Sequence, residues 1–118
     1  MLKILLVGLG GMLGSILRYS FYYLPLPYIK TFYINLIGAF LIGFLSAFFE
    51  KYTQFNGTLK LFLITGLCGG FTTFSTFSLE FFTLLKNNNF FEALIYAIAS
   101  VLVSLVLVCI GYYFGKIF

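Results

Sequence analysis

The sequence predicts an all-α integral membrane protein with four transmembrane helices, and three observations support this. Of its 118 residues, 62% are hydrophobic and only 8% are charged, whereas about 25% charged residues are ordinary for a soluble domain. Four segments supply the ~20 mostly apolar residues that a membrane-spanning helix needs. Short stretches rich in turn-forming residues separate them. The cations are scattered, so no basic face for nucleic acid forms.

The first predicted helix covers about residues 2–24. Its beginning, MLKILLVGLGGMLGS, could also pass for a signal peptide. The apolar character resumes beyond Arg18, which favours a retained helix, and Pro25 and Pro27 then prevent the helix from continuing. The second predicted helix covers about 31–49.

Asn35 is the only strongly polar residue deep in the second helix. Polar side chains at that depth usually face protein or a water-filled path. The amide of Asn35 could donate to an anion, or it could make a hydrogen bond between helices. The residues alone leave both alternatives open.

The third predicted helix, about 59–85, contains the unusual run GLCGGFTTFSTFSLEF. Adjacent glycines and β-branched threonines are poor helix formers. We therefore expect the helix to unwind near Gly69–Thr73 and to restart near Phe74. Irregular backbone at membrane depth is tolerated only where protein buries it or where it lines a cavity. The alternative is a continuous helix whose hydroxyls bond back to their own carbonyls.

Two phenylalanines follow the predicted break, at a spacing that places them on one side of a helix. Phe74 and Phe77 are three residues apart, and the positive edges of their rings can contact an anion. Ser75, Thr76 and Ser78 add hydroxyl donors nearby. Ordinary aromatic packing is the alternative for the pair.

The fourth predicted helix covers about 90–116. Tyr96, Ser100 and Ser104 recur every four residues and place three hydroxyls on one face. Such a row suits a partly dehydrated anion, and hydroxyl bonding between helices is the alternative. Both cysteines lie in apolar segments, and we expect them to be buried free thiols. They are Cys68 and Cys109.

Small residues recur at the spacing of helix packing in the first, second and fourth helices. Without a hydrophobic force between helices in lipid, glycine allows backbones to approach closely, and we favour packing over a functional role. A four-span chain has little interior of its own, so we also expect a homo-oligomer. The glycines are Gly10, Gly14, Gly38, Gly43, Gly111 and Gly115.

The predicted topology divides the cations four against three between the two sides of the membrane. This is a weak bias under the positive-inside rule, so insertion in both orientations and an antiparallel dimer become possible. A single orientation is the alternative. The side of the termini has Lys3, Lys51, Lys60 and Lys116; the other has Lys30, Lys86 and Arg18.

Three stretches together resemble the Fluc (CrcB-type) fluoride channel family: GGMLGSILRY at 10–19, NLIGAFLIG at 35–43 and GLCGGFTTFSTFS at 66–78. The resemblance covers nearly the whole chain, and the third motif is highly specific. It implies a dual-topology, antiparallel homodimer in the bacterial plasma (inner) membrane. It also implies two passive fluoride pores that are selective against chloride.

The resemblance assigns roles to residues by position. Asn35 matches the pore asparagine, and Phe74 and Phe77 match the phenylalanines whose ring edges meet fluoride. The backbone carbonyls of Gly69 and Thr72 match those that hold a central structural sodium at the dimer axis.

The polar track of the fourth helix matches Tyr96, Ser100 and Ser104. Arg18 matches an arginine of the first motif, whose role stays open. Arg18 and Glu80 are the interior ionisable residues, and each could serve a pore vestibule or pair with another charge.

The resulting hypothesis is a channel that exports fluoride and is not an enzyme. Hydrogen fluoride crosses membranes as a neutral molecule and dissociates inside, so a passive anion path relieves the trapped ion. One rival is a small dual-topology, proton-coupled exporter of cationic compounds, which needs a membrane-embedded carboxylate. The first two helices offer none at depth. The other rival is a structural membrane subunit without transport activity.

Overall fold

The computed structural model describes residues 1–55 and 57–118 and is helical throughout its regular parts. Four helical spans are long and apolar enough to cross a membrane, which confirms the predicted all-α, four-span architecture. Every predicted end lies within two residues of the observed one. The observed spans are Leu2–Tyr23, Lys30–Lys51, Thr58–Lys86 and Phe90–Ile117.

The described residues form nine helical elements, because two of the spans change helix type along their length and a short 3₁₀ helix, η2, lies between the second and third spans. A 3₁₀ turn ends the first span, and wide π-helical turns form much of the first half of the third. The elements are α1 (Leu2–Ser20), η1 (Phe21–Tyr23), α2 (Lys30–Lys51), η2 (Thr53–Phe55), α3 (Thr58–Lys60), η3 (Leu61–Cys68), α4 (Gly69–Phe71), α5 (Phe74–Lys86) and α6 (Phe90–Ile117).

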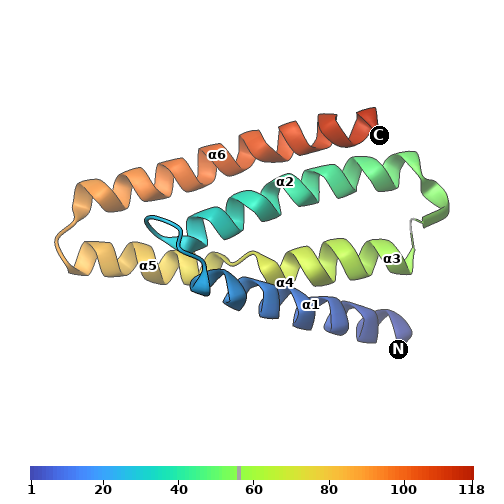
Figure 1. The fold of residues 1–118 in the computed structure, drawn as a ribbon, viewed down its shortest axis with the longest axis horizontal. Coiled ribbons are helices and arrows are strands. Elements are labelled where there is room, and N and C mark those ends of the chain that lie inside the picture. The colour runs from blue at the N-terminus through green and yellow to red at the C-terminus, as the bar shows by residue number, and fades with distance from the viewer. Residues whose placement is uncertain (56) are drawn as a thin grey trace.

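The helices pack as two main pairs (Figure 1). Helix α2 lies along α6, and α1 lies along η3 and α4. The two termini and the connection between α2 and α3 share one end, while the turn between α5 and α6 lies at the other.

Glycines form both pair interfaces, as the packing interpretation predicted. A Cβ atom on Gly43 of α2 would meet the carbonyl oxygen of Val108 in α6, and one on Gly111 would meet that of Phe40. On α1, a Cβ atom on Gly14 would lie 2.7 Å from the backbone nitrogen of Phe71. The backbones touch directly in these places, as they do in membrane helix pairs.

The turn between α5 and α6 stops one helix and reverses the chain within three asparagines. Asn88 has the left-handed φ of 63°, a conformation that asparagine tolerates better than most residues. Its N–H donates to the Leu85 carbonyl at 3.0 Å, and the Asn89 N–H donates to the Leu84 carbonyl at 2.8 Å. These two bonds are the Schellman motif that satisfies the last carbonyls of a helix.

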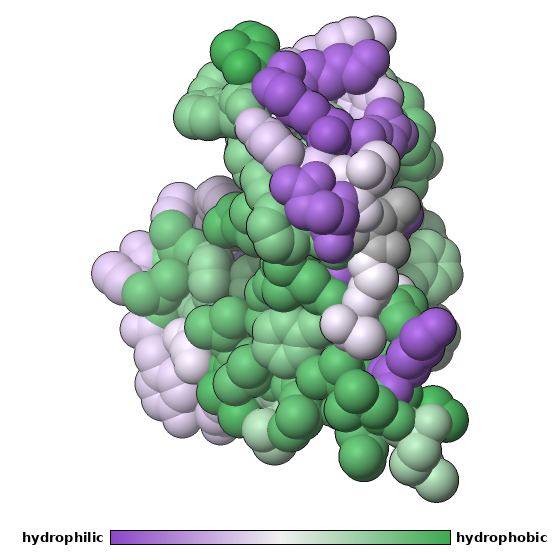
Figure 2. Space-filling model, turned by 90° about the vertical axis from the view of Figure 1, so that its right-hand side faces the viewer, coloured by the Kyte–Doolittle hydropathy of each residue, from purple (hydrophilic) through white to green (hydrophobic). Residues whose placement is uncertain are grey.

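The surface of the single chain is largely apolar. Figure 2 looks onto the end with both termini, where hydrophilic residues gather in patches and hydrophobic residues cover most of the remaining face. Large side chains such as Leu105 and Val106 of α6 are more than half exposed. Surface of this kind is suited to lipid or to a second membrane chain and not to water.

Candidate functional site

Two extended residues, Thr72 and Thr73, separate α4 from α5 in the third span. Thr72 has φ −81° and ψ 155°, and Thr73 has φ −150° and ψ 123°. Helix α5 begins at Phe74, where the sequence predicted a restart. The glycines are not unwound, which corrects that part of the prediction: Gly69 has helical φ −62° and ψ −38°.

The glycine pair has a packing role in the helix that precedes Thr72. A Cβ atom on Gly70 would lie 2.9 Å from the Cα atom of Gly11 in α1. A Cβ atom on Gly69 would meet only its own helix, at 3.9 Å from the Ile64 oxygen. Gly70 therefore allows α1 to approach, whereas Gly69 borders open space in the single chain.

The side chain of Asn35 in α2 makes hydrogen bonds with both the N–H and the carbonyl of Thr73. Its Nδ2 donates to the Thr73 carbonyl at 3.1 Å, and the Thr73 N–H donates to its Oδ1 at 2.9 Å. The structure thus contains the bond between elements that the sequence left as one alternative. An amide group has two N–H donors, so one donor of Asn35 remains for another partner.

The Thr73 hydroxyl caps α5. It accepts a hydrogen bond from the Thr76 N–H at 3.2 Å and donates to the Thr76 hydroxyl, also at 3.2 Å. Threonine is a common N-cap because its oxygen replaces a missing helical acceptor. The Ser75 hydroxyl lies 3.3 Å from the same oxygen.

A groove of about 430 Å³ opens beside the extended residues, between α2, the third span and α6. Most of its lining is apolar, with a few hydroxyl, amide and backbone groups. The predicted site residues on its wall are Asn35, Gly69, Thr72, Phe74, Phe77, Ser100 and Ser104.

Ser100 is a buried donor without a partner in this groove. Its side chain is 7% exposed, and its Oγ has no hydrogen-bond partner in the described part of the chain. An unsatisfied buried hydroxyl is costly, so such a group in a native fold calls for an explanation. A ligand in the groove would supply the missing acceptor.

The two phenylalanines form a ring pair at the edge of the groove. The ring centroids of Phe74 and Phe77 are 5.5 Å apart, and the Phe77 ring lies 5.2 Å from that of Tyr96. Phe77 is partly buried, whereas Phe74 is 77% exposed. The spacing argument placed both rings on one side correctly, but one chain alone does not enclose Phe74.

Glu80 is the centre of a hydroxyl network between α2, α5 and α6. The hydroxyls of Thr31 and Tyr96 donate to its two carboxylate oxygens at 2.6 Å and 2.8 Å. Thr31 and Tyr96 are at most 1% exposed. The Tyr22 hydroxyl lies 2.9 Å from that of Thr31 and extends the network towards the surface.

This network changes the expectation for Tyr96, because its hydroxyl binds Glu80 and Tyr96 is not on the groove wall. Sequence reasoning missed Thr31 and Tyr22. The available signal was the presence of hydroxyls near helix ends on the side of Glu80, but their meeting depends on how α2 and α5 pack.

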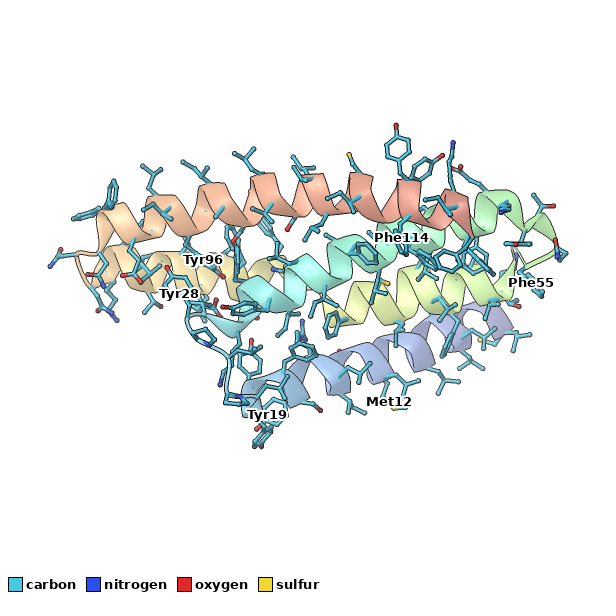
Figure 3. All side chains as sticks on the ribbon, turned by 45° about the horizontal axis from the view of Figure 1, so that its top comes forward. Met12, Tyr19, Tyr28, Phe55, Tyr96 and Phe114 are labelled. Carbon is cyan, nitrogen blue, oxygen red and sulfur yellow. The ribbon has the colours of Figure 1, made fainter. Side chains whose placement is uncertain are left out.

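Tyr28 covers this network from the loop between η1 and α2. Its ring meets that of Tyr96 edge to face at a centroid distance of 6.3 Å, and Figure 3 shows the two side chains as neighbours. Tyr28 has a φ of 68°, which is unusual for a bulky residue. Burial and the adjacent Glu92 carboxylate both raise the pKa of Tyr28, so its phenol is neutral at physiological pH.

Other predicted residues lie away from the groove wall. Arg18 is in the last turn of α1, and the Ser78 hydroxyl donates to the Phe74 carbonyl at 2.9 Å, bonding back along its own helix. Cys68, which does line the groove, is a buried free thiol, as expected. Cys109 is an exposed free thiol, contrary to expectation, because its side of α6 has no neighbour in the single chain.

Comparison with known proteins gives one consistent result. The family model for CrcB-like protein, Camphor Resistance (CrcB), matches residues 5–112. Curated relatives named fluoride-specific ion channel FluC include that of Azobacteroides pseudotrichonymphae, 38% identical, and that of Gloeothece citriformis, 42% identical. Another, from Flavobacterium psychrophilum, is 41% identical. In all three cases the match covers 98% of this chain and 98% of the relative.

Proposed function

Since this chain belongs to the CrcB-like family, whose curated relatives are fluoride-specific ion channels, we propose that it is a passive fluoride channel. It is a multi-pass protein of the bacterial inner membrane and a transport protein, not an enzyme. It lets fluoride leave the cell down its electrochemical gradient and so relieves fluoride toxicity.

The groove beside Asn35 is the observation that supports this function most strongly. Among the described residues, its wall combines the second amide N–H of Asn35, the unpartnered Ser100 hydroxyl and the Ser104 hydroxyl, and no charged side chain lines it. The edges of Phe74 and Phe77 add weak positive potential. Such a set of neutral donors can replace the water of a small anion without trapping the ion at a fixed charge.

We propose that the working unit is an antiparallel homodimer with both orientations present in the membrane. The exposed Phe74 ring and the open space at Gly69 support a second copy covering this face. Near-balanced cations on the two sides support dual topology. Each pore would then combine residues of both chains. Ser75 and Thr76 would contribute pore hydroxyls, and Tyr96 would contribute through its hydrogen bond to Glu80.

The sodium that the family resemblance implies fits this backbone, and we propose that the carbonyls of Gly69 and Thr72 hold it. A continuous α-helix would satisfy these carbonyls with the N–H groups of Thr73 and Thr76, which donate elsewhere. Carbonyl oxygens suit a hard cation. When bound, sodium would neutralise carbonyl ends that are costly in the membrane.

The roles of Arg18 and Glu80 differ in this proposal. Glu80 has a structural role, because each of its carboxylate oxygens accepts a hydrogen bond from a hydroxyl of a different helix. Arg18 lies in the last turn of α1, where its long side chain can extend to the membrane–water interface. There it would form part of the vestibule.

Transport by purified protein in liposomes tests the function and separates its rivals. Liposomes loaded with potassium fluoride and supplied with a potassium ionophore should release fluoride to an external electrode within seconds to minutes. Liposomes loaded with chloride should not release their anion. Proton-coupled uptake of a cationic dye would support the exporter instead, and no transport of either kind would support the structural subunit.

A further inference from the structure

Two side chains redirect the amide donors that would otherwise occupy the proposed cation ligands. In an uninterrupted α-helix, each N–H donates to the carbonyl four residues earlier. The Gly69 carbonyl would receive the Thr73 N–H, and the Thr72 carbonyl would receive the Thr76 N–H. Both donors have other partners in this structure.

The first of these donors, the Thr73 N–H, bonds instead to the side chain of Asn35 on the neighbouring helix α2. The Thr73 N–H donates to Asn35 Oδ1 at 2.9 Å, and the Asn35 amide returns a bond to the Thr73 carbonyl at 3.1 Å. This reciprocal pair resembles the pairing of two strand residues. It stabilises the extended conformation of Thr73 and prevents its N–H from returning to Gly69.

The second donor is taken by the Thr73 side chain. The Thr76 N–H donates to the Thr73 hydroxyl at 3.2 Å, a capping bond that competes with helix continuation. Cys68 provides the contrast within the same segment. Its carbonyl keeps the Thr72 N–H at 3.0 Å and also accepts the Thr72 hydroxyl at 2.9 Å.

We infer that Asn35 and Thr73 are positioning residues that create the cation site, because they keep amide donors away from the Gly69 and Thr72 carbonyls. This inference rests on the proposed sodium site but assigns Asn35 a task besides contact with the anion. It also assigns a task to Thr73, which the sequence did not single out as a ligand.

Solid-state NMR of the full-length protein in bilayers tests this with labels that the sequence makes selective. The chain has one Thr-Thr pair, Thr72–Thr73, and one Cys-Gly pair, Cys68–Gly69. Carbonyl ¹³C on the first residue and amide ¹⁵N on the second therefore report single carbonyls. Replacing N-methylglucamine with sodium should shift the Thr72 carbonyl signal and leave the Cys68 signal in place.

The variants then separate positioning from general stability. Thr73→Val removes the hydroxyl acceptor, Thr73→Ser retains it, and Asn35→Leu removes both amide contacts. In the two Thr73 variants the amide ¹⁵N label is placed on valine or on serine, because no other threonine in the chain is followed by either residue. We expect Thr73→Val and Asn35→Leu to need about tenfold more sodium for half of the Thr72 shift, the factor that ~1.4 kcal/mol represents. Thr73→Ser should match the unaltered protein. Thr83→Val, which removes an exposed hydroxyl bonded within its own helix, is the matched control.

Three outcomes would overturn the inference. In the first, sodium does not shift the Thr72 carbonyl signal of the unaltered protein. In the second, sodium shifts the Cys68 carbonyl signal equally. In the third, the variants lose thermal stability while their sodium dependence is unchanged. If Asn35→Leu does not fold, the comparison of Thr73→Val with Thr73→Ser still decides, because equal sodium dependence in these two variants would overturn the positioning role. A sodium response without fluoride flux would refute the proposed function but support the inference.

Discussion

Alanine at Gly70 and at Gly69 should have opposite effects, although the two positions are adjacent. At Gly70, the new Cβ atom would lie 2.9 Å and 3.0 Å from the Cα and carbonyl carbon of Gly11. These are backbone atoms of a packed helix, so α1 itself must move. At Gly69, the Cβ atom meets nothing closer than 3.9 Å in its own chain.

The magnitudes follow from two opposing effects. Replacing glycine with alanine inside a helix gains up to ~1 kcal/mol in helix propensity. Forcing a methyl group into a packed interface costs about 1–3 kcal/mol, and more when backbone must shift. We therefore expect Gly70→Ala to destabilise the fold by about 1–3 kcal/mol and Gly69→Ala to leave the single-chain fold unchanged or slightly more stable. In the proposed dimer, Gly69→Ala should instead weaken association, because the second chain crosses there.

Two assays separate these effects. Thermal unfolding in detergent reports the fold, and single-molecule subunit capture in lipid reports association. Gly8→Ala is the control, because a Cβ atom there meets nothing within 4 Å. Equal loss of thermal stability in the Gly69 and Gly70 variants would refute the packing argument. A Gly69→Ala dimer as strong as the original would refute the crossing of two chains at this point.

Three further predictions concern the pore, the Glu80 network and the topology. Phe74→Ile and Phe77→Ile should each slow fluoride efflux at least tenfold, which corresponds to an activation free energy about 1.4 kcal/mol higher. Both variants should still elute as folded protein in size-exclusion chromatography. Unchanged efflux would remove the rings from the mechanism. Tyr96→Phe should destabilise the fold by about 1–3 kcal/mol because one Glu80 oxygen loses its donor, whereas Tyr113→Phe, on an exposed side chain, should have no effect in the same thermal assay. Tags at either terminus should be labelled from both sides of the membrane, and two or three added lysines in the 86–89 turn should fix one orientation and impair function; one-sided labelling of the original protein would contradict dual topology.

The sequence predicted the spans well because the signals for them are local. Apolar length, prolines at 25 and 27, and the asparagines after Lys86 determine where a membrane helix can start and stop. The spacing of Phe74 and Phe77 likewise needs only helix geometry. These features do not depend on which helices become neighbours.

Features that depend on neighbouring helices were not predictable from these local signals. Glycines such as Gly69 and Gly70 are poor helix formers, but Gly70 is needed within its helix because the absence of a side chain there allows α1 to pack closely. The Thr31 and Tyr96 hydroxyls meet Glu80 only because α2, α5 and α6 converge. From the sequence, Asn35 could equally have contacted an anion or another helix. Only the packing of α2 against the third span places the Thr73 backbone within hydrogen-bond distance of it.

A bilayer recording with a fluoride gradient tests the central claim of passive, fluoride-selective conduction most directly. Purified protein would separate two chambers with equal chloride and unequal fluoride, and with N-methylglucamine and trace sodium as the cations. The account predicts a current that reverses at the fluoride equilibrium potential and does not follow a chloride gradient. Reversal at the chloride, proton or cation potential, or no current from protein shown to be folded and dimeric, would contradict it.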